Sequence, residues 1–214
     1  MITLYAHGSP NPHKVSIALE ELALEYKSEV VDVWQGAQHA DAFTALNPNA
    51  KVPVIVDSDT GQTISESNAI LLYLAEKTGR LFPTSRNERW EGMQLLFFQA
   101  ASVGPMWGQR AHFSLFAPEK PPYAVDRYIK EGSRLEAVLE RLLGSREFFL
   151  PSDYSIIEIA IFGWAWCAVH QGFGFEETPK LQAWYDRIAA RPAVQRGVTI
   201  PMPLPDFSPF RNAA

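Results

Sequence analysis

The sequence contains almost no sulfur that could take part in chemistry. Cys167 is its single cysteine, which excludes a disulfide within the chain and any metal site built from several cysteines. The five histidines are not spaced as paired metal ligands. Any thiol chemistry therefore needs a thiol from a ligand, and the low cysteine content indicates a reducing compartment, which we expect to be the cytoplasm.

Positive charge and long apolar runs are also scarce. Lys and Arg number 19 against 24 Asp and Glu, a net charge of −5, and no Lys/Arg cluster offers a local field for phosphates. The most apolar segment, residues 156–169, is interrupted by Glu158 and is too short to cross a bilayer. The first residues lack the basic and apolar regions of a signal peptide. We therefore expect binding to neither nucleic acid nor membrane.

The chain does contain enough apolar sequence for a buried core, with 47% hydrophobic and 12% aromatic residues. Apolar residues at helical spacing predict a helix over 12–24, with Asn11 as N-cap and Pro12 at the first helical position. The predicted order is strand 2–5, helix 12–24, strand 28–33, short helix 41–46, strand 53–57, strand 62–64 and helix 66–77. This order resembles the α/β thioredoxin-like fold, which we assign to residues 1–80.

The pattern of apolar residues changes after residue 80. Glycine and proline in residues 79–83 interrupt the last helix, and we take residues 81–87 as a linker. Beyond the linker the apolar spacing is helical, which predicts an all-α domain over residues 88–214. Within it, Ser155 and Glu158 have the spacing of a capping box, and Cys167 lies among apolar and aromatic residues. We expect these three residues to be structural.

Residues 51–70 suggest a peptide ligand. A β-branched run entered through Pro53 predicts a strand, and Ser65 or Ser67 begins a helix whose first N–H groups suit a carboxylate. Such a pair can hold a peptide by its backbone and its α-carboxylate. Either serine can also be a simple helix cap.

A thioredoxin-like first half joined to an all-helical second half resembles the cytosolic glutathione transferases over essentially the whole chain. Within that superfamily Thr3-Leu4-Tyr5, Ser9-Pro10-Asn11, residues 70–79 (ILLYLAEKTG) and residues 104–109 (GPMWGQ) resemble the nu class. The resemblance implies glutathione as cosubstrate, glutathione-dependent disulfide-bond reductase activity and a homodimer.

The resemblance also assigns roles within residues 51–70. Val52 would precede a cis Pro53 and pair with the cysteinyl part of glutathione like an added strand, with Lys51 beside it in the binding site. Glu66 would bind the γ-glutamyl ammonium group, and Ser67 with the helix N–H groups would bind its carboxylate.

By the same resemblance, the chemistry centres on Ser9 and Asn11, at the corner where thioredoxins carry C-x-x-C. Their hydroxyl and amide groups would donate hydrogen bonds to the glutathione sulfur and stabilise its thiolate. Spacing alone would make Ser9 a loop hydroxyl and Asn11 a helix cap. Pro12 stands where the family commonly has glycine and would stiffen this loop. Tyr5 lies earlier, within the strand, and we expect it to pack in the core.

Four further residues are implied with less support from the sequence itself. Gln38 would reach the glutathione backbone, although a loop glutamine can simply be solvated. Arg127 would bind a carboxylate of a second glutathione or of glutathione disulfide, although it can equally be a surface arginine beside Asp126. Gln94 and Gln99 would lie across a dimer interface.

Three functions stay open at this point. The bound thiolate can attack a disulfide, which is the reductase activity that we favour. It can instead attack an electrophilic carbon, as in conjugation, or an organic hydroperoxide. The third alternative is a non-catalytic glutathione-binding or scaffold protein, since related folds also serve without catalysis.

Overall fold

The computed structural model of the chain describes residues 1–211, which divide into two units. One unit comprises Met1–Phe82 together with Ala190–Pro205. The other comprises Pro83–Ala189 together with residues 206–211. The return of residues 190–205 to the first unit differs from the expectation that residues 88–214 form one helical domain.

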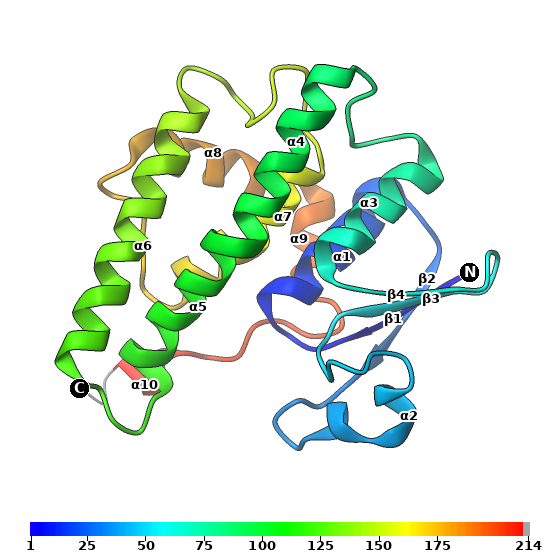
Figure 1. Ribbon diagram of the computed structural model, residues 1–214, viewed down its shortest axis with the longest axis horizontal. Coiled ribbons are helices and arrows are strands. Elements are labelled where there is room, and N and C mark those ends of the chain that lie inside the picture. The colour runs from blue at the N-terminus through cyan, green and yellow to red at the C-terminus, as the bar shows by residue number, and fades with distance from the viewer. Residues whose placement is uncertain (212–214) are drawn as a thin grey trace. The chain divides into compact units, whose positions relative to one another are not determined.

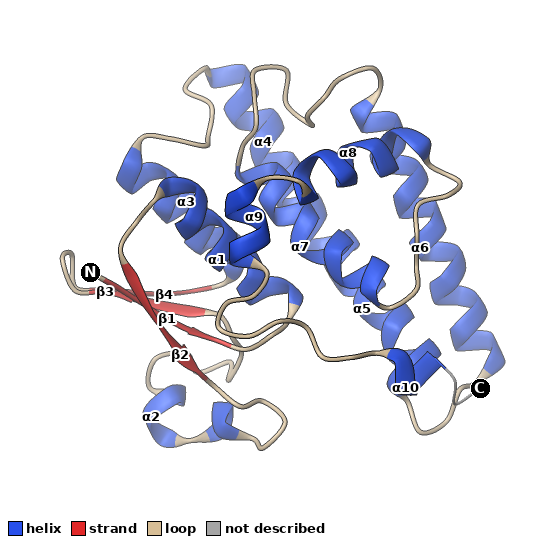
Figure 2. Cartoon of the chain, turned by 180° about the vertical axis from the view of Figure 1, so that it is seen from behind, coloured by secondary structure: helices blue, strands red, loops and turns tan. Residues whose placement is uncertain are grey.

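A four-stranded mixed sheet forms the centre of the first unit (Figure 2). The strand β1, Ile2–Ala6, alternates between buried and partly exposed residues, as a strand with two different faces should. It pairs in parallel with β2, Tyr26–Val30, and antiparallel with β3, Val54–Asp57. β3 pairs antiparallel with β4, Gln62–Ser65, so the strand order is β2-β1-β3-β4.

Helices cover both faces of this sheet. The helices α1, Pro10–Leu22, and α3, Ser67–Thr78, lie on one face, and the short helix α2, Asp41–Thr44, lies on the other (Figure 1). A single 3₁₀ turn, η1, Ala37–His39, precedes α2. On the α2 face Tyr5 packs in a cluster around Phe43, which confirms its expected structural role.

The start of α1 corrects the sequence prediction. Ser9, not Asn11, is the N-cap residue, with φ −155° and ψ 164°, and Pro10 occupies the first helical position. The helix begins two residues earlier than expected because proline is favoured at that position, where its missing N–H has no intrahelical partner to lose. Asn11 therefore lies inside the first turn, and the Ser9 side chain makes no capping hydrogen bond.

The helix α9, Pro192–Gly197, joins the first unit by packing on α1. Gly197 permits this approach, because a Cβ atom there would lie 2.6 Å from the Ile17 Cα atom. The Ser16 hydroxyl donates a hydrogen bond to the Gly197 carbonyl at 2.7 Å. Close backbone packing of this kind needs glycine at the contact, and sequence periodicity does not reveal it.

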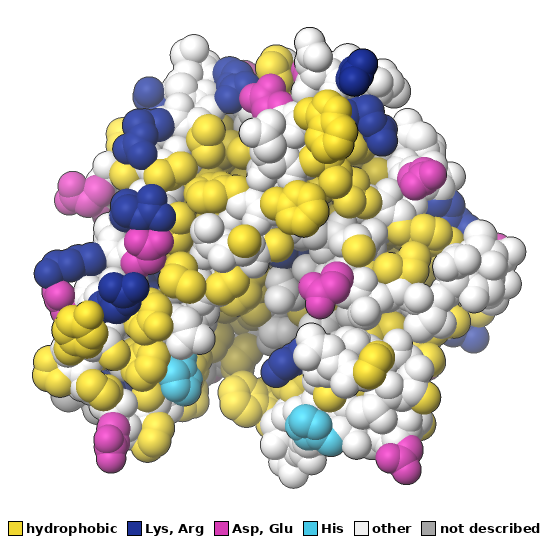
Figure 3. Space-filling model, viewed as in Figure 1, with side chains coloured by type: hydrophobic (Ala, Val, Ile, Leu, Met, Phe, Trp, Pro, Cys, Tyr) yellow, Lys and Arg dark blue, Asp and Glu magenta, His cyan; other side chains and the backbone are white. Residues whose placement is uncertain are grey.

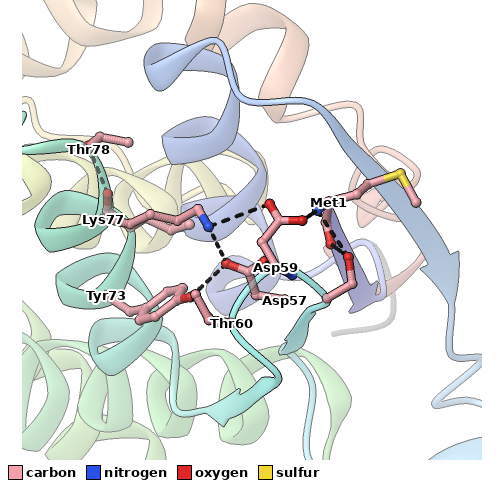
Figure 4. A network of polar contacts seen from close by, with 9 residues as sticks. Met1, Asp57, Asp59, Thr60, Tyr73, Lys77 and Thr78 are labelled. Atoms are coloured by element: carbon pink, nitrogen blue, oxygen red, sulfur yellow. Dashed lines mark hydrogen bonds and ion pairs between the residues drawn. The ribbon is translucent and has the colours of Figure 1, made fainter.

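A buried carboxylate fixes the β3–β4 turn to α3 (Figure 4). Asp57 accepts hydrogen bonds from the Tyr73 hydroxyl at 2.6 Å and from the Lys77 ammonium at 2.7 Å, and its side chain is fully buried. Burial alone would raise the pKa of Asp57, but these hydrogen bonds outweigh it and hold the pKa below its usual range. The network also includes Asp59, which pairs with the amino group of Met1.

The second unit is helical in the part of the chain that the structure describes. Its elements are α4 Arg86–Phe98, the π-helical turn η2 Gln99–Val103, α5 Gly104–Ala111, the π-helical turn η3 His112–Phe116, α6 Pro122–Leu143, α7 Ile156–His170, α8 Pro179–Ala189 and α10 Ser208–Arg211.

Helix α7 is the core helix of this unit and is apolar nearly all round. Its start confirms the expected capping box: Ser155 Oγ accepts from the Ile157 N–H at 3.2 Å, and Glu158 Oε2 accepts from the Ser155 N–H at 2.8 Å. Cys167 is buried, as expected, and burial raises the pKa of its thiol to about 12. The thiol is therefore protonated at neutral pH and unreactive as a nucleophile.

Candidate functional site

The peptide-binding edge predicted around Val52 begins with a cis Val52–Pro53 bond, as the family resemblance implied. Lys51 is exposed and Val52 is half-buried. The loop before them is held by Asn47, whose buried amide donates to the Lys51 carbonyl at 2.7 Å and accepts from the Asn49 N–H at 3.1 Å. Asn47 is a positioning residue that sequence reasoning missed, although its Asn-Pro-Asn context is typical of a side chain that orders a turn.

The N-terminus of α3 presents the predicted carboxylate-binding pair. Glu66 is exposed and has φ 66° and ψ 109°, a backbone conformation that non-glycine residues rarely adopt. Strain of this kind persists where the surrounding structure over-determines it, and it occurs often at binding sites. Ser67, the first residue of α3, is buried. The exposed carboxylate and the buried hydroxyl thus lie next to each other at a helix N-terminus.

Asn11, in the first turn of α1, contacts the N-terminus of α3. Ser67 Oγ donates to Asn11 Oδ1 at 3.5 Å, although the two residues are 56 positions apart in the sequence. Ser9 is half-buried, and its hydroxyl lies 3.5 Å from the His7 carbonyl oxygen. Both of these 3.5 Å separations are too long for a strong hydrogen bond. The structure therefore brings together Ser9, Asn11, Glu66 and Ser67 within the first unit.

The electrostatics of this corner differ from those of a thioredoxin. Pro10 and Pro12 carry no backbone N–H, so among the first three residues of α1 only Asn11 has one. The helix terminus therefore offers fewer N–H groups to an anion than an ordinary first turn does. A thiolate bound at this point would depend more on side-chain donors than on backbone N–H groups, and Ser9 and Asn11 are the predicted donors.

Lys14 is a second residue of the site that sequence reasoning missed. Its side chain is 1% exposed, and its Nζ donates to Ser67 Oγ at 3.3 Å and to Asn68 Oδ1 at 3.2 Å. Burial lowers the pKa of the Lys14 ammonium to about 7, although the Glu66 carboxylate opposes the shift. The signal was present in the sequence, because Lys14 lies one helical turn before Ala18 on the predicted buried face of α1.

Gln38 lies in the loop after β2, within η1. Its Nε2 atom lies 3.2 Å from His39 Nε2, while its Oε1 atom is buried and has no hydrogen-bond partner among residues 1–211. A buried amide oxygen without a partner is costly unless a ligand or water satisfies it. Gln38 thus retains an acceptor for a bound molecule.

Arg127 belongs to the second unit, on α6, where it lines a hollow of about 490 Å³ with Met106 of α5. The neighbouring charges in this hollow are paired: Lys130 with Asp126 at 2.7 Å and Arg134 with Glu131 at 2.7 Å. Arg127 is exposed and forms no ion pair within residues 1–211. Its guanidinium group therefore remains available for a carboxylate.

The two glutamines predicted at a dimer interface lie in different environments. Gln94 is exposed on α4, and its amide donates to the Trp90 carbonyl at 3.2 Å. Gln99 is 1% exposed, so the expectation that it reaches a partner subunit is wrong. It lies in the π-helical turn η2, which directs it toward the core beside Gly104.

Residues 1–211 lack two other kinds of feature. They contain no group of three or more His, Cys, Asp or Glu side chains that could hold a metal ion. None of their helices is long and apolar enough to cross a membrane.

Two family models match the chain: the glutathione S-transferase N-terminal domain over residues 8–77 and the glutathione S-transferase C-terminal domain over residues 105–192. The disulfide-bond oxidoreductase YfcG of Escherichia coli is 41% identical over 198 residues, which cover 90% of this chain and 92% of the relative.

Solved structures of glutathione transferases are also similar to this chain. A glutathione transferase from Pseudomonas putida, with one glutathione disulfide bound per subunit, is 38% identical with a TM-score of 0.87 and covers 94% of this chain and 91% of its own. One from Burkholderia graminis, with two glutathione molecules bound per subunit, is 38% identical with a TM-score of 0.88 and covers 94% of this chain and 88% of its own. The chain therefore belongs to the glutathione S-transferase family.

Proposed function

We propose that this chain is a glutathione-dependent enzyme that uses the glutathione thiolate to reduce disulfides. The observation that carries the proposal is the contact between Ser67 and Asn11 in a chain whose single thiol is buried and protonated. The carboxylate end and the sulfur end of one tripeptide would be bound by adjacent side chains, and the protein supplies no competing sulfur.

The first unit binds the tripeptide in this proposal. The backbone of Val52, before the cis Pro53, pairs with the cysteinyl residue as an added strand. Glu66 binds the γ-glutamyl ammonium group, and Ser67 binds its carboxylate with help from the α3 N-terminus. Lys51 and Gln38 contact the rest of the ligand.

Ser9 and Asn11 act on the sulfur. Their O–H and N–H groups donate to the thiolate and favour it over the thiol. The thiolate attacks one sulfur of the substrate disulfide, forms a mixed disulfide and releases the other sulfur as a thiolate, which takes a proton from solvent. A second glutathione thiolate attacks the glutathione sulfur of the mixed disulfide, giving glutathione disulfide and the second substrate thiol. Two glutathiones lose one electron each, and the substrate disulfide gains two.

Arg127 binds a carboxylate of the second glutathione in this scheme. It is the unpaired cation among the charged residues of its hollow, within the part of the chain that the structure describes. The relatives from Pseudomonas putida and Burkholderia graminis hold one glutathione disulfide and two glutathione molecules per subunit, respectively. These ligands support a site for two tripeptides in this chain as well.

The test compares rates with a small disulfide, an aryl halide and an organic hydroperoxide under identical glutathione concentrations. The proposal requires disulfide turnover to dominate. Turnover of the aryl halide or the hydroperoxide without disulfide turnover would replace it with a transferase or peroxidase function. Failure to bind glutathione or its disulfide in a calorimetric titration would indicate a scaffold protein.

The chain is also proposed to act as a homodimer in the cytoplasm, with α4 at the interface. Trp90 and Phe97 are 63% and 68% exposed, and with Gln94 they follow the i, i+4, i+7 spacing of one helix face. Exposed apolar side chains lie over this helix in Figure 3. Exposed aromatic residues in such a stripe are typical of a protein interface. Light scattering should give twice the chain mass, and Trp90→Glu with Phe97→Glu should give the monomer mass.

A further inference from the structure

Lys14 is buried more completely than lysines usually are. It is 1% exposed on α1, one turn after Asn11, and lysine is almost never fully buried unless it is paired. Core packing does not explain a buried ammonium, since an apolar side chain would fill the same space without loss of hydration. A requirement for a cation at this point of the fold does explain it.

The contacts of Lys14 place its charge directly behind the proposed carboxylate site. Its Nζ donates to Ser67 Oγ at 3.3 Å and to Asn68 Oδ1 at 3.2 Å, both in the first turn of α3. Ser67 Oγ in turn donates to Asn11 Oδ1 at 3.5 Å. The hydroxyl of Ser67 thus stands between the buried cation and the amide that faces the sulfur in the proposed mechanism.

Glu66 is the carboxylate whose attraction opposes the effect of burial on the Lys14 pKa. Across α9, Arg191 and Arg196 are paired with Glu21 and Glu20 of α1. His13 Nε2 lies 3.1 Å from the Met202 carbonyl oxygen. Buried His7, after β1, lies with its ring 6.4 Å from Trp34. On α3 Glu66 is exposed, so its attraction for Lys14 is weakened by water.

We propose that Lys14 is a positioning residue that takes up a proton when the γ-glutamyl carboxylate binds at the N-terminus of α3. This inference rests on the proposed function, because it assumes that glutathione binds there. Ser67 then accepts a hydrogen bond from the Lys14 ammonium while it donates its own proton to the carboxylate. The bound carboxylate adds a negative charge beside Ser67, within reach of the ammonium, and the protonated lysine polarises the hydroxyl that holds it.

A proton uptake near neutral pH follows from this arrangement. The pKa of the Lys14 ammonium is about 7 before the ligand binds, and a carboxylate in contact with Ser67 raises it. Well below pH 7 the lysine is charged already, so affinity there is independent of pH. Above pH 7 binding must include proton uptake, and affinity falls by up to about tenfold for each pH unit until the pKa of the complex is reached.

Calorimetric titration with S-methylglutathione tests the proposal, because this ligand keeps both carboxylates and has no thiol to ionise. Titrations at pH 7.5 in two buffers of different ionisation enthalpy should give an uptake of roughly half a proton per ligand. Lys14→Met should abolish most of this uptake and make affinity nearly constant between pH 6.5 and 8.5. The KM of the Lys14→Met variant for glutathione should exceed that of the unmodified enzyme by about tenfold at pH 6.5, with kcat changed little.

The control is Lys27→Met, which removes the same charge from an exposed position on β2. It should retain the proton uptake and the pH dependence of the unmodified enzyme. If the unmodified enzyme binds S-methylglutathione without proton uptake, or if Lys14→Met retains the uptake, the role of Lys14 is refuted. Absence of S-methylglutathione binding by the unmodified enzyme would instead refute the proposed function. The first of these measurements needs no variant and does not depend on whether Lys14→Met folds.

Discussion

Replacement of Asn11 by alanine should raise the pKa of the bound glutathione thiol and leave the binding of the tripeptide largely intact. The two prolines of the first turn remove two backbone N–H groups, so the side chains of Ser9 and Asn11 must provide much of the thiolate stabilisation. A hydrogen bond to a charged group contributes about 1.5–3 kcal/mol. One pKa unit corresponds to about 1.4 kcal/mol, so loss of the Asn11 amide should raise the thiol pKa by about one to two units.

The effect on rate should change sign with pH. Below the thiol pKa the variant has less thiolate. Each thiolate is more nucleophilic, however, because thiolate nucleophilicity rises with the thiol pKa with a Brønsted coefficient of about 0.4–0.5. Disulfide reduction should therefore slow by only about three- to tenfold at low pH. Above both pKa values the variant should be somewhat faster than the unmodified enzyme.

Ultraviolet absorbance of the thiolate, followed against pH in the glutathione complex, measures this pKa directly. Ser9→Ala should produce a shift in the same direction. Pro12→Gly restores a backbone N–H in the first turn, so it should leave the thiol pKa unchanged or lower it. An unchanged thiol pKa in Asn11→Ala, with glutathione still bound, would refute the assignment of Asn11 to the sulfur.

Four further outcomes are expected. Cys167→Ala should retain full disulfide reductase activity, and a large loss would show that the protein thiol takes part. Arg127→Ala should raise the Kd of glutathione disulfide by about tenfold, as loss of a paired hydrogen bond to a carboxylate would, whereas Lys130→Ala in the same hollow should have little effect. Asp57→Asn should lower the free energy of unfolding by about 2–3 kcal/mol in denaturant titrations at pH 7. Because the pKa of Asp57 is lowered in the folded state, this difference between the variant and the unmodified protein should disappear as the pH falls below about 4. Gly197→Ala should lower the melting temperature and cost about 1–3 kcal/mol, since the added Cβ meets the backbone of Ile17.

The order of elements was predictable because each local pattern agreed with the fold. The first strand, the apolar face of α1 and the capping box at Ser155 all lie where the sequence indicated. Element ends were less accurate. Helix α1 runs from Pro10 to Leu22, whereas the prediction ran from 12 to 24; its start was misplaced because a second proline two residues upstream also suits a first helical turn. The strand β2 covers Tyr26–Val30 and not the predicted residues 28–33.

What sequence reasoning missed depends on contacts between distant segments. The need for glycine at position 197 follows from the packing of α9 on α1, which the sequence does not show. Gln99 is polar, and only the π-helical turn reveals that it lies in the core. Lys14 was overlooked for a related reason. A lysine on an apolar helix face is normally read as a residue whose ammonium reaches water along the surface, and only the position of α3 shows that it does not.

In the proposed function, the site combines two helix N-termini that have different electrostatic tasks. At α3 the helix terminus, Ser67 and the buried Lys14 supply positive potential for a carboxylate, which carries its charge throughout the reaction. At α1 the charge on sulfur appears and disappears during catalysis, so strong fixed stabilisation would hold the thiolate in an unreactive state. Two prolines weaken the α1 terminus, and the neutral donors of Ser9 and Asn11 supply a graded stabilisation instead. Binding strength and thiol reactivity can then be set separately, although Ser67 and Asn11 are in contact.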